Sequence, residues 1–163
     1  MNDDISQRLA ALEAKVGRLA DIEAIRQLRM RYHEAINGGL YDTIPAMFTE
    51  DGVVDFDYIG RVEGHEKIGR FFAKTPEVLP FIKQFIHNHV VEVDGDRGTG
   101  FSYLEAKTVA KGEAFVVAAR YDDVYARVDG QWRFKSMTLE AYFTVPLRQG
   151  WAENRRVIMT RDE

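Results

Sequence analysis

Four long segments in the second half of the chain alternate apolar and polar residues as β-strands do, and short turns separate them. Asp129-Gly130 between the last two segments is a strong signal for a two-residue hairpin, and Lys111-Gly112 marks a second turn. Consecutive strands joined this tightly must pair antiparallel, so the pattern predicts a meander of long hairpins. The predicted strands cover residues 85–94, 99–109, 115–128 and 131–145.

The first part of the chain has helical rather than strand periodicity. Apolar residues recur at spacings of three and four from Ile5 to Ile36, and Gly38-Gly39 provides a stop. Gly17 and Asp21 suggest a break, with Asp21 capping the second helix. The first helix, residues 5–16, is marginal alone, so we expect it to dock on the domain or on another subunit.

The segments between these two regions are short, and together they complete an α+β pattern. We expect a cone-shaped, curved antiparallel sheet with the N-terminal helices packed over its concave face. The chain reads as one domain, 1–163, with a core of about 20–147 and a peripheral charged tail at 151–163. The intervening predictions are a helix at 40–48, a turn at 49–52, a strand at 53–58, a turn at 60–64, a helix at 65–73 and a loop at 75–80.

Composition excludes several classes of function. The net charge is −4 with both signs interspersed, so no electrostatic footprint for nucleic acid is present. The chain has no cysteine, which excludes disulfides, thiolate nucleophiles and cysteine-ligated zinc. No apolar run approaches the length of a membrane span, and the acidic N-terminus does not resemble a signal peptide. We therefore expect a cytoplasmic protein with no nucleic-acid or membrane partner.

Aromatic residues alternate along the long helix and the strands, on the side that a curved sheet must fill. They form either an ordinary core or the wall of a cavity, and the pattern alone does not distinguish the two. These aromatic residues are Tyr32, Phe56, Phe85, Tyr103, Tyr121, Phe134 and Tyr142.

Several short motifs make the chain resemble the SnoaL-like superfamily over roughly residues 5–147. The motifs are Asp21-Ile22-Glu23-Ala24-Ile25-Arg26 leading to Tyr32, Phe48-Thr49-Glu50-Asp51-Gly52, Gly64 before Ile68, Asn88-His89-Val90-Val91-Glu92-Val93-Asp94-Gly95-Asp96, and Tyr121-Asp122-Asp123 ahead of Asp129-Gly130-Gln131-Trp132-Arg133. The resemblance implies the cone-shaped, cystatin-like fold shared by scytalone dehydratase, bile-acid 7α-dehydratase and polyketide cyclases. The fold alone does not specify the chemistry.

The dehydratase-type relatives use a carboxylate at the end of the long helix and a histidine on the facing strand. On this chain the carboxylate position falls on Asn37, and the histidine position, four residues before Asn88, falls on Gln84. Both are amides, which do not act as bases near neutral pH. The resemblance therefore predicts that Asn37, Gln84 and Asn88 orient a ligand rather than move its protons.

The resemblance assigns further pocket positions with different outcomes. An aspartate of the bile-acid enzyme falls on Ala106, and an arginine of other members falls near Met137. Tyr32 matches a tyrosine that the bile-acid enzyme uses as an acid, and it would donate to a substrate oxygen. Without that role, Tyr32 is an ordinary core residue. Phe56 is expected in the pocket wall.

The histidines offer substitutes for the missing base. His87 and His89 flank Asn88, so alternation places both on one face of the strand unless a bulge intervenes. Either histidine is a candidate base. A metal would need a third ligand such as His33, Glu92 or Asp57, and we expect neither a metal nor an organic cofactor. His33 is more typical of an exposed or interfacial residue, and His65 of a solvated helix start.

Aspartates give another set of alternatives. Asp55 and Asp57 share one face of a predicted strand, either as a solvated face or with Asp55 as a base in the cavity. Asp123 is expected in a structural ion pair with Arg127 or Arg120.

Three functions fit these observations. The first is a cofactor-independent lyase or isomerase acting on an apolar, cyclic molecule, with Tyr32 as donor and His87, His89 or Asp55 as base. The second is a binding protein that holds a small apolar molecule without turnover. The third is an accessory subunit of an aromatic-ring hydroxylating system. The striped first helix and the open sheet face further predict a homodimer or homotrimer.

Overall fold

The structure is a computed structural model that describes residues 2–153. It opens with one continuous helix, α1 (Asn2–Gly38), about 55 Å long at 1.5 Å per residue. The predicted break at Gly17 and Asp21 is wrong, because a single helical glycine costs only about 1 kcal/mol and does not end a helix by itself. The helix does end where predicted, at Gly39, whose φ of 72° is left-handed.

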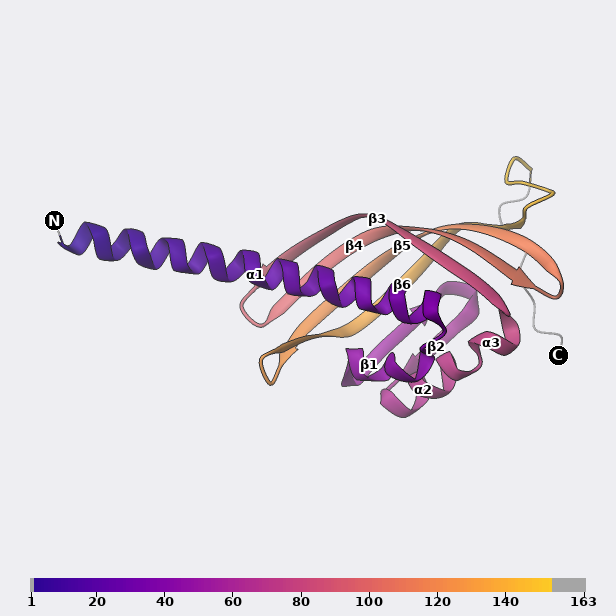
Figure 1. Cartoon of the computed structure of the whole chain (residues 1–163), viewed down its shortest axis with the longest axis horizontal. Helices are drawn as coiled ribbons and strands as arrows, with labels where there is room; N and C mark the ends of the chain where they lie inside the picture. Colours follow the sequence, from indigo (N-terminus) through magenta and orange to yellow (C-terminus); the bar gives the residue numbers. More distant parts are fainter. Residues whose placement is uncertain (1, 154–163) are drawn as a thin grey trace.

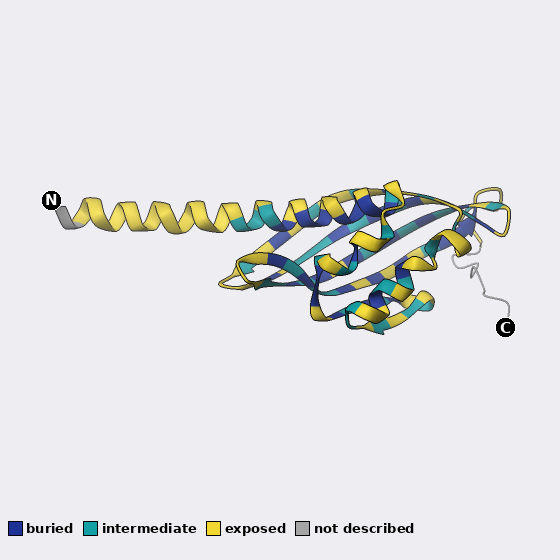
Figure 2. Ribbon diagram, turned by 60° about the horizontal axis from the view of Figure 1, so that its bottom comes forward, coloured by how far each residue is buried: buried dark blue, intermediate teal, exposed yellow. Residues whose placement is uncertain are grey.

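The two halves of α1 have different surroundings. The second half packs on the sheet and buries a stripe that includes Ile25, Leu28, Tyr32 and Ile36. The first half projects beyond the sheet (Figure 1), and its residues 4–20 are exposed (Figure 2). Of the two expected docking sites for residues 5–16, the domain itself is therefore wrong, and another subunit stays a prediction.

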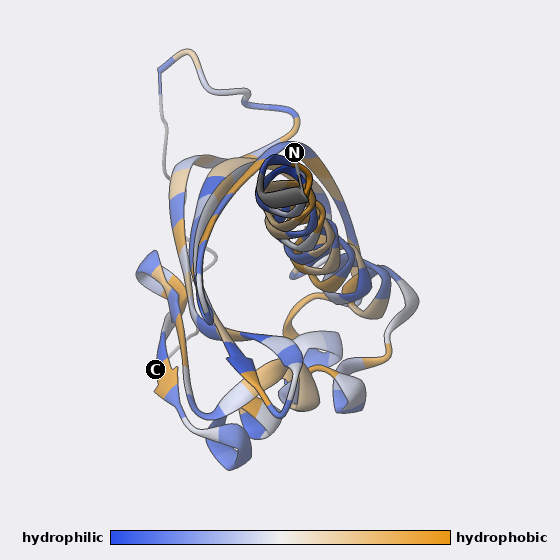
Figure 3. Cartoon of the chain, turned by 90° about the vertical axis from the view of Figure 1, so that its left-hand side faces the viewer, coloured by the Kyte–Doolittle hydropathy of each residue, from blue (hydrophilic) through white to orange (hydrophobic). Residues whose placement is uncertain are grey.

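Six strands form one curved, unclosed sheet that bends around α1 (Figure 3). Their spatial order is β2-β1-β6-β5-β4-β3. The strands are β1 (Phe48–Phe56), β2 (Gly60–Glu63), β3 (Phe81–Asp94), β4 (Arg97–Ala110), β5 (Glu113–Val128) and β6 (Gln131–Pro146). The meander from β3 to β6 confirms the predicted hairpins. At the β5–β6 turn, Asp129 and Gly130 have φ values of 51° and 74°, as a tight two-residue hairpin requires.

The sheet is mixed rather than purely antiparallel. β1 pairs parallel to β6, whereas the other neighbouring strands pair antiparallel. The predicted turn at 49–52 lies inside β1, where the register with β6 shifts between Phe48 and Val53. Gly52 suits this crowded stretch, because an added Cβ would lie 2.9 Å from the Cβ of Phe48. The α+β class is confirmed. The prediction of a purely antiparallel sheet is wrong, because β1 pairs in parallel with β6.

Short elements cap the concave side of the sheet. The helix predicted at 40–48 is instead two 3-10 turns, η1 (Tyr41–Thr43) and η2 (Pro45–Met47). The end of the predicted strand 53–58 forms a third turn, η3 (Asp57–Ile59), and β2 occupies the predicted turn at 60–64. The helix predicted at 65–73 is confirmed as α2 (His65–Ala73), and the predicted loop contains α3 (Thr75–Val78). Part of the predicted tail, residues 154–163, lies outside the described residues.

Within the described residues, no helix combines the length and apolar character needed to cross a membrane.

Candidate ligand-binding cavity

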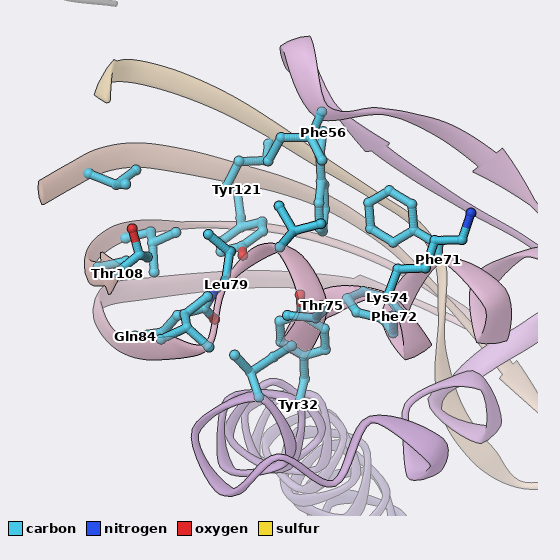
Figure 4. Close-up of a pocket in the computed structure, with 18 of the residues that line it drawn as sticks. Tyr32, Phe56, Phe71, Phe72, Lys74, Thr75, Leu79, Gln84, Thr108 and Tyr121 are labelled. Carbon is cyan, nitrogen blue, oxygen red and sulfur yellow. The ribbon is translucent and has the colours of Figure 1, made fainter. Parts of the chain in front are cut away.

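A cavity of about 130 Å³ lies between the second half of α1 and the concave face of the sheet (Figure 4). Apolar side chains make up most of its wall, and the short helices α2 and α3 cover one side. The lining residues are Tyr32, Ile36, Phe56, Tyr58, Ile59, Phe71, Phe72, Lys74, Thr75, Val78, Leu79, Ile82, Gln84, Leu104, Ala106, Thr108, Val117, Tyr121 and Leu139.

The mouth of the cavity lies between η3 and the α2–α3 segment. Ile59 and Val78, each with more than a third of its surface exposed, line the cavity from these two segments, and exposed Lys74 stands beside them. Residues from β4, β5 and β6 are buried at the closed side. A ligand would therefore enter past α3, and the end that enters first would lie against the sheet.

Tyr32 from α1 and Tyr121 from β5 both line the cavity, and their rings pack edge to face with the centres 6.3 Å apart (Figure 4). The Tyr32 hydroxyl is buried beside the side chain of Tyr121, but the two do not form a hydrogen bond of standard geometry. Burial raises the pKa of Tyr32 well above its ordinary value of 10, so this phenol stays protonated. Tyr32 therefore provides a buried donor that a ligand oxygen can satisfy.

Thr108 is a second unsatisfied group in the wall. It comes from β4, and its hydroxyl is buried without a hydrogen-bond partner in the described part of the chain. In Figure 4 it lies at the opposite end of the cavity from Phe71. Buried hydroxyls without partners are unfavourable by about 1–3 kcal/mol, so both hydroxyls favour the binding of a molecule with matching polar atoms.

Gln84 joins the cavity to the end of α1. Its side-chain oxygen lies 2.8 Å from Nδ1 of His33, while its backbone pairs with the side chain of Asn37. The Asn37 amide donates to the Gln84 carbonyl at 2.9 Å and accepts from the Gln84 N–H at 2.7 Å. The two amide positions that the resemblance singled out therefore do meet, but the side chain of Asn37 is occupied in fixing β3 to α1 and does not line the cavity.

His33 is buried, against the expectation of an exposed or interfacial residue. Its ring packs edge-on against Tyr32 and Tyr121, and its Nε2 has no hydrogen-bond partner within residues 2–153. Burial and the nearby charge of Arg29 lower the pKa of His33 from 6.5 to about 3. The imidazole is therefore neutral near pH 7 and a weak base.

A buried ionic network lies next to the cavity. Its arginine, Arg29, is on α1, about one helical turn before Tyr32. Arg29 is fully buried and pairs with Asp123, which also accepts a 2.7 Å hydrogen bond from Tyr125. The guanidinium lies over the ring of Tyr121, with its carbon 4.4 Å from the ring centre. Burial opposes the charge of Arg29, but the attraction of Asp123 outweighs it and raises the pKa of the guanidinium.

Arg29 is the residue that sequence reasoning missed. It lies four residues after Ile25 and four before His33, so the helical period places it on the buried stripe. The predicted partners of Asp123 are wrong, since Arg127 pairs with Asp21 and Asp96, and Arg120 pairs with Asp122. The position of charged Arg29 on the apolar stripe of the helix was the sequence feature that could have indicated its buried ion pair.

A bulge separates the two strand histidines. The β3–β4 register shifts between His87 and Val90, and Asn88 at the bulge has a φ of 51° and an exposed side chain. The expectation that His87 and His89 share a face is therefore wrong.

The two histidines have different neighbours as a result. His87 is exposed near Glu105, whereas Nε2 of His89 lies 3.1 Å from the hydroxyl of Tyr125. Burial and the charges of Arg29 and Arg26 lower the pKa of His89 to about 4. Neither histidine lines the cavity.

The remaining candidate residues lie in varied places. Phe56 lines the cavity, while the carboxylate of Asp55, one position before it, is partly exposed and lies 3.9 Å from the guanidinium of Arg61. Met137 is buried and accepts a hydrogen bond from Arg29 at 3.6 Å. His65 is not simply solvated, because its Nε2 lies 2.8 Å from the carbonyl of Phe48. No group of three potential metal ligands occurs in residues 2–153.

The sequence profile of the SnoaL-like domain matches residues 17–138, three quarters of the chain. The chain belongs to the SnoaL-like family. An uncharacterised protein of Mycobacterium tuberculosis is 27% identical over 122 residues, covering 72% of this chain and 83% of that protein.

Several solved structures have the same fold. A hexachlorocyclohexane dehydrochlorinase of type 2 matches with a TM-score of 0.77 at 20% identity, covering 82% of this chain and 93% of that one. A candidate scytalone dehydratase from Novosphingobium aromaticivorans matches with a TM-score of 0.72 at 20% identity, covering 78% and 88%. At this identity the likeness establishes the fold and leaves the chemistry to the residues of the cavity.

Proposed function

We propose that this SnoaL-like protein binds a small, uncharged and mostly apolar molecule bearing one oxygen, and holds it without turnover. The observation that carries the proposal is the cavity wall. Among the described residues it contains apolar groups, neutral hydroxyls and the amide of Gln84, and no carboxylate or imidazole. The one charged group of the wall, Lys74, stands at the exposed mouth.

Size and polarity define the ligand class. A dry apolar cavity of about 150 Å³ holds one benzene ring, so this cavity fits a single ring, with any larger substituent extending through the mouth. The buried Tyr32 hydroxyl, kept protonated by its raised pKa, would donate to the ligand oxygen. A carbonyl or hydroxyl on a six-membered ring meets both requirements.

The neighbouring imidazoles support binding over acid–base turnover. A general base works best when its pKa lies near the working pH. The pKa values of His33 and His89, about 3 and about 4, lie well below neutrality. The buried imidazole of His33 and the partly buried imidazole of His89 would therefore accept a proton only weakly.

Cyclohexanone, with benzene as the oxygen-free comparison, tests this proposal by calorimetric titration. In Tyr32→Phe the affinity for cyclohexanone should fall by about 1 kcal/mol, roughly fivefold, while benzene binding stays the same. The matched control is Tyr125→Phe, which removes a buried hydroxyl already bonded to Asp123 outside the cavity and should leave both affinities unchanged. Equal losses for both probes in Tyr32→Phe would contradict the assignment.

A cofactor-independent lyase or isomerase is the second candidate, favoured by the buried Tyr32 donor together with the unpartnered Nε2 of His33. Such an enzyme removes a proton next to a polarised carbonyl. The test is exchange of the α-hydrogens of cyclohexanone for deuterium in D₂O, followed by NMR. Exchange that the protein accelerates and that His33→Gln abolishes would replace the binding proposal with this one.

A further inference from the structure

The exposed half of α1 carries an apolar stripe of its own, which we term the N-terminal seam: Ile5, Leu9, Leu12, Val16 and Leu19. The spacings are 4, 3, 4 and 3 residues, the heptad repeat of a coiled coil. All five side chains are 55–63% exposed. A regular row of large apolar residues on a projecting helix is unfavourable in water unless another surface covers it.

The seam does not face the domain to which it belongs. At 100° per residue, its five members centre roughly 150° around the helix axis from the stripe that packs on the sheet. The first half of α1 also extends beyond the sheet (Figures 1 and 2). The surface that covers the seam therefore lies outside this domain.

We infer that the N-terminal seam pairs with the same seam of a second copy of this chain, forming a parallel two-stranded coiled coil. In heptad terms, Leu9 and Val16 occupy a positions, while Ile5, Leu12 and Leu19 occupy d positions. Val16 at a, between Leu12 and Leu19 at d, is the combination typical of parallel dimers, whereas Leu9 at a and Ile5 at d do not follow it.

The charged residues flanking the seam favour the parallel arrangement. Arg8 occupies a g position and Glu13 the following e position, so each Arg8 of a parallel pair meets Glu13 of the other copy. An antiparallel pair would instead bring the g residues Arg8 and Lys15 of the two copies together, and like charges would repel. Neither Arg8 nor Glu13 makes an ion pair within the described chain, so both are available.

The sequence also sets the length of the coiled coil. The next a and d positions are Glu23 and Arg26, where like charges from the two copies would meet, so the pairing ends after Leu19. Each seam residue exposes on the order of 100 Å² of surface, so the ten residues of two seams would bury roughly 1,000 Å². This area is near the lower limit for a specific interface. Because the seam and the sheet lie on nearly opposite sides of α1, the two domains would sit on opposite sides of the coil without clashing.

Disulfide cross-linking tests the register and direction of this pairing, since the chain has no cysteine of its own. Leu19→Cys places thiols face to face in a parallel coil, whereas in an antiparallel coil they lie far apart. Ala14→Cys, on an exposed helix position outside the seam, is the matched control. Mild oxidation should convert most of Leu19→Cys and little of Ala14→Cys to a covalent dimer. Equal yields for the two variants would overturn the inference.

Sedimentation equilibrium tests the pairing without a cross-link. The wild type should have twice the 18.7 kDa monomer mass, and Leu12→Glu should reduce it to the monomer mass. Because Leu12 touches no part of the folded domain, thermal unfolding of the domain in this variant should be unchanged. A monomeric or trimeric wild type, or an unchanged mass in Leu12→Glu, would contradict the inference.

Charge reversal tests the Arg8–Glu13 contact itself. Arg8→Glu alone should weaken the dimer several-fold, and adding Glu13→Arg should restore it, because the pair is then re-formed with opposite polarity. Failure of the second change to restore the dimer would show that the two residues do not meet.

Discussion

The two halves of α1 have the same apolar periodicity and opposite surroundings. From Ile25 onward the stripe is buried against the sheet, and between Ile5 and Leu19 an equally regular stripe is exposed. Periodicity therefore predicts that a helix has an apolar side, but it does not identify what covers that side. The direction of the stripe decides this, because a rotation of roughly 150° turns the first half away from its own domain.

The largest expected difference between the two halves of α1 is in the free energy of unfolding that is lost when an arginine is replaced. Arg29→Ala leaves Asp123 buried without its counter-charge and should lower the free energy of unfolding by about 3–5 kcal/mol. Arg18→Ala, in the exposed half, should change it by less than about 0.5 kcal/mol. Denaturant unfolding measures both.

A double variant sharpens the arginine comparison. Replacing both buried partners, as Arg29→Met with Asp123→Leu, should recover much of the lost stability, because no lone charge remains buried. A double variant as unstable as Arg29→Ala would mean that the hydrogen bond from Tyr125 and the packing of the guanidinium on Tyr121 matter more than the charge pair.

Replacing a leucine in each half of α1 gives the next largest expected difference in stability. Leu28→Ala empties a buried site and should lower the free energy of unfolding by about 2–5 kcal/mol at any protein concentration. Leu12→Ala, at a side chain that is 60% exposed, should have little effect in dilute protein. Its effect should grow with protein concentration if the seam pairs with a second copy, since mass action then links dimerisation to stability. A concentration-independent effect would separate the exposed stripe from self-association.

The second half of α1 should also make stability depend on pH through His33. Its pKa is about 3 in the folded protein against 6.5 in a free histidine, so between these values the unfolded chain binds a proton that the folded one does not. This contribution is complete above about pH 6.5 and is lost as the pH falls, by up to about 1.4 kcal/mol per pH unit. In His33→Gln the stability should fall less steeply between pH 6.5 and 4, and above pH 7 the two proteins should have the same slope.

Local sequence features account for the parts of the fold that were predictable. The β5–β6 hairpin followed from Asp129-Gly130, and the end of α1 from Gly38-Gly39, because these residues specify backbone geometry directly. The parallel pairing of β1 with β6 joins segments about 80 residues apart in the sequence, and no local pattern encodes it. The bulge at Asn88 is similarly invisible in a strand that alternates regularly, yet one inserted residue reverses the face of every side chain beyond it.

The position of the candidate cavity was predictable from the sequence. The hydrogen-bond partners and the burial of the side chains around it were not. The resemblance placed Gln84 and Tyr32 in the pocket, where both are found, and it placed Asn37 beside Gln84. The bonding of Asn37 to the Gln84 backbone, which removes its side chain from the cavity, depends on how α1 crosses β3. The burial of Arg29 and His33 depends on the same packing, since a charged or titratable side chain on a helix stripe is ordinarily expected to reach solvent.

The smallest expected effect lies at Gly17, where a helix break was predicted and none is present. An added Cβ would meet no atom within 4 Å, and the backbone is helical, so Gly17→Ala should favour the helix by up to about 1 kcal/mol locally. The free energy of unfolding of the domain should not change, because the first half of α1 contacts no other element. Amide hydrogen exchange over residues 8–20 should therefore slow several-fold, while exchange in β5 stays the same. If both regions slow together, the two halves of α1 unfold as one unit, and the exposed half is coupled to the domain through the helix backbone.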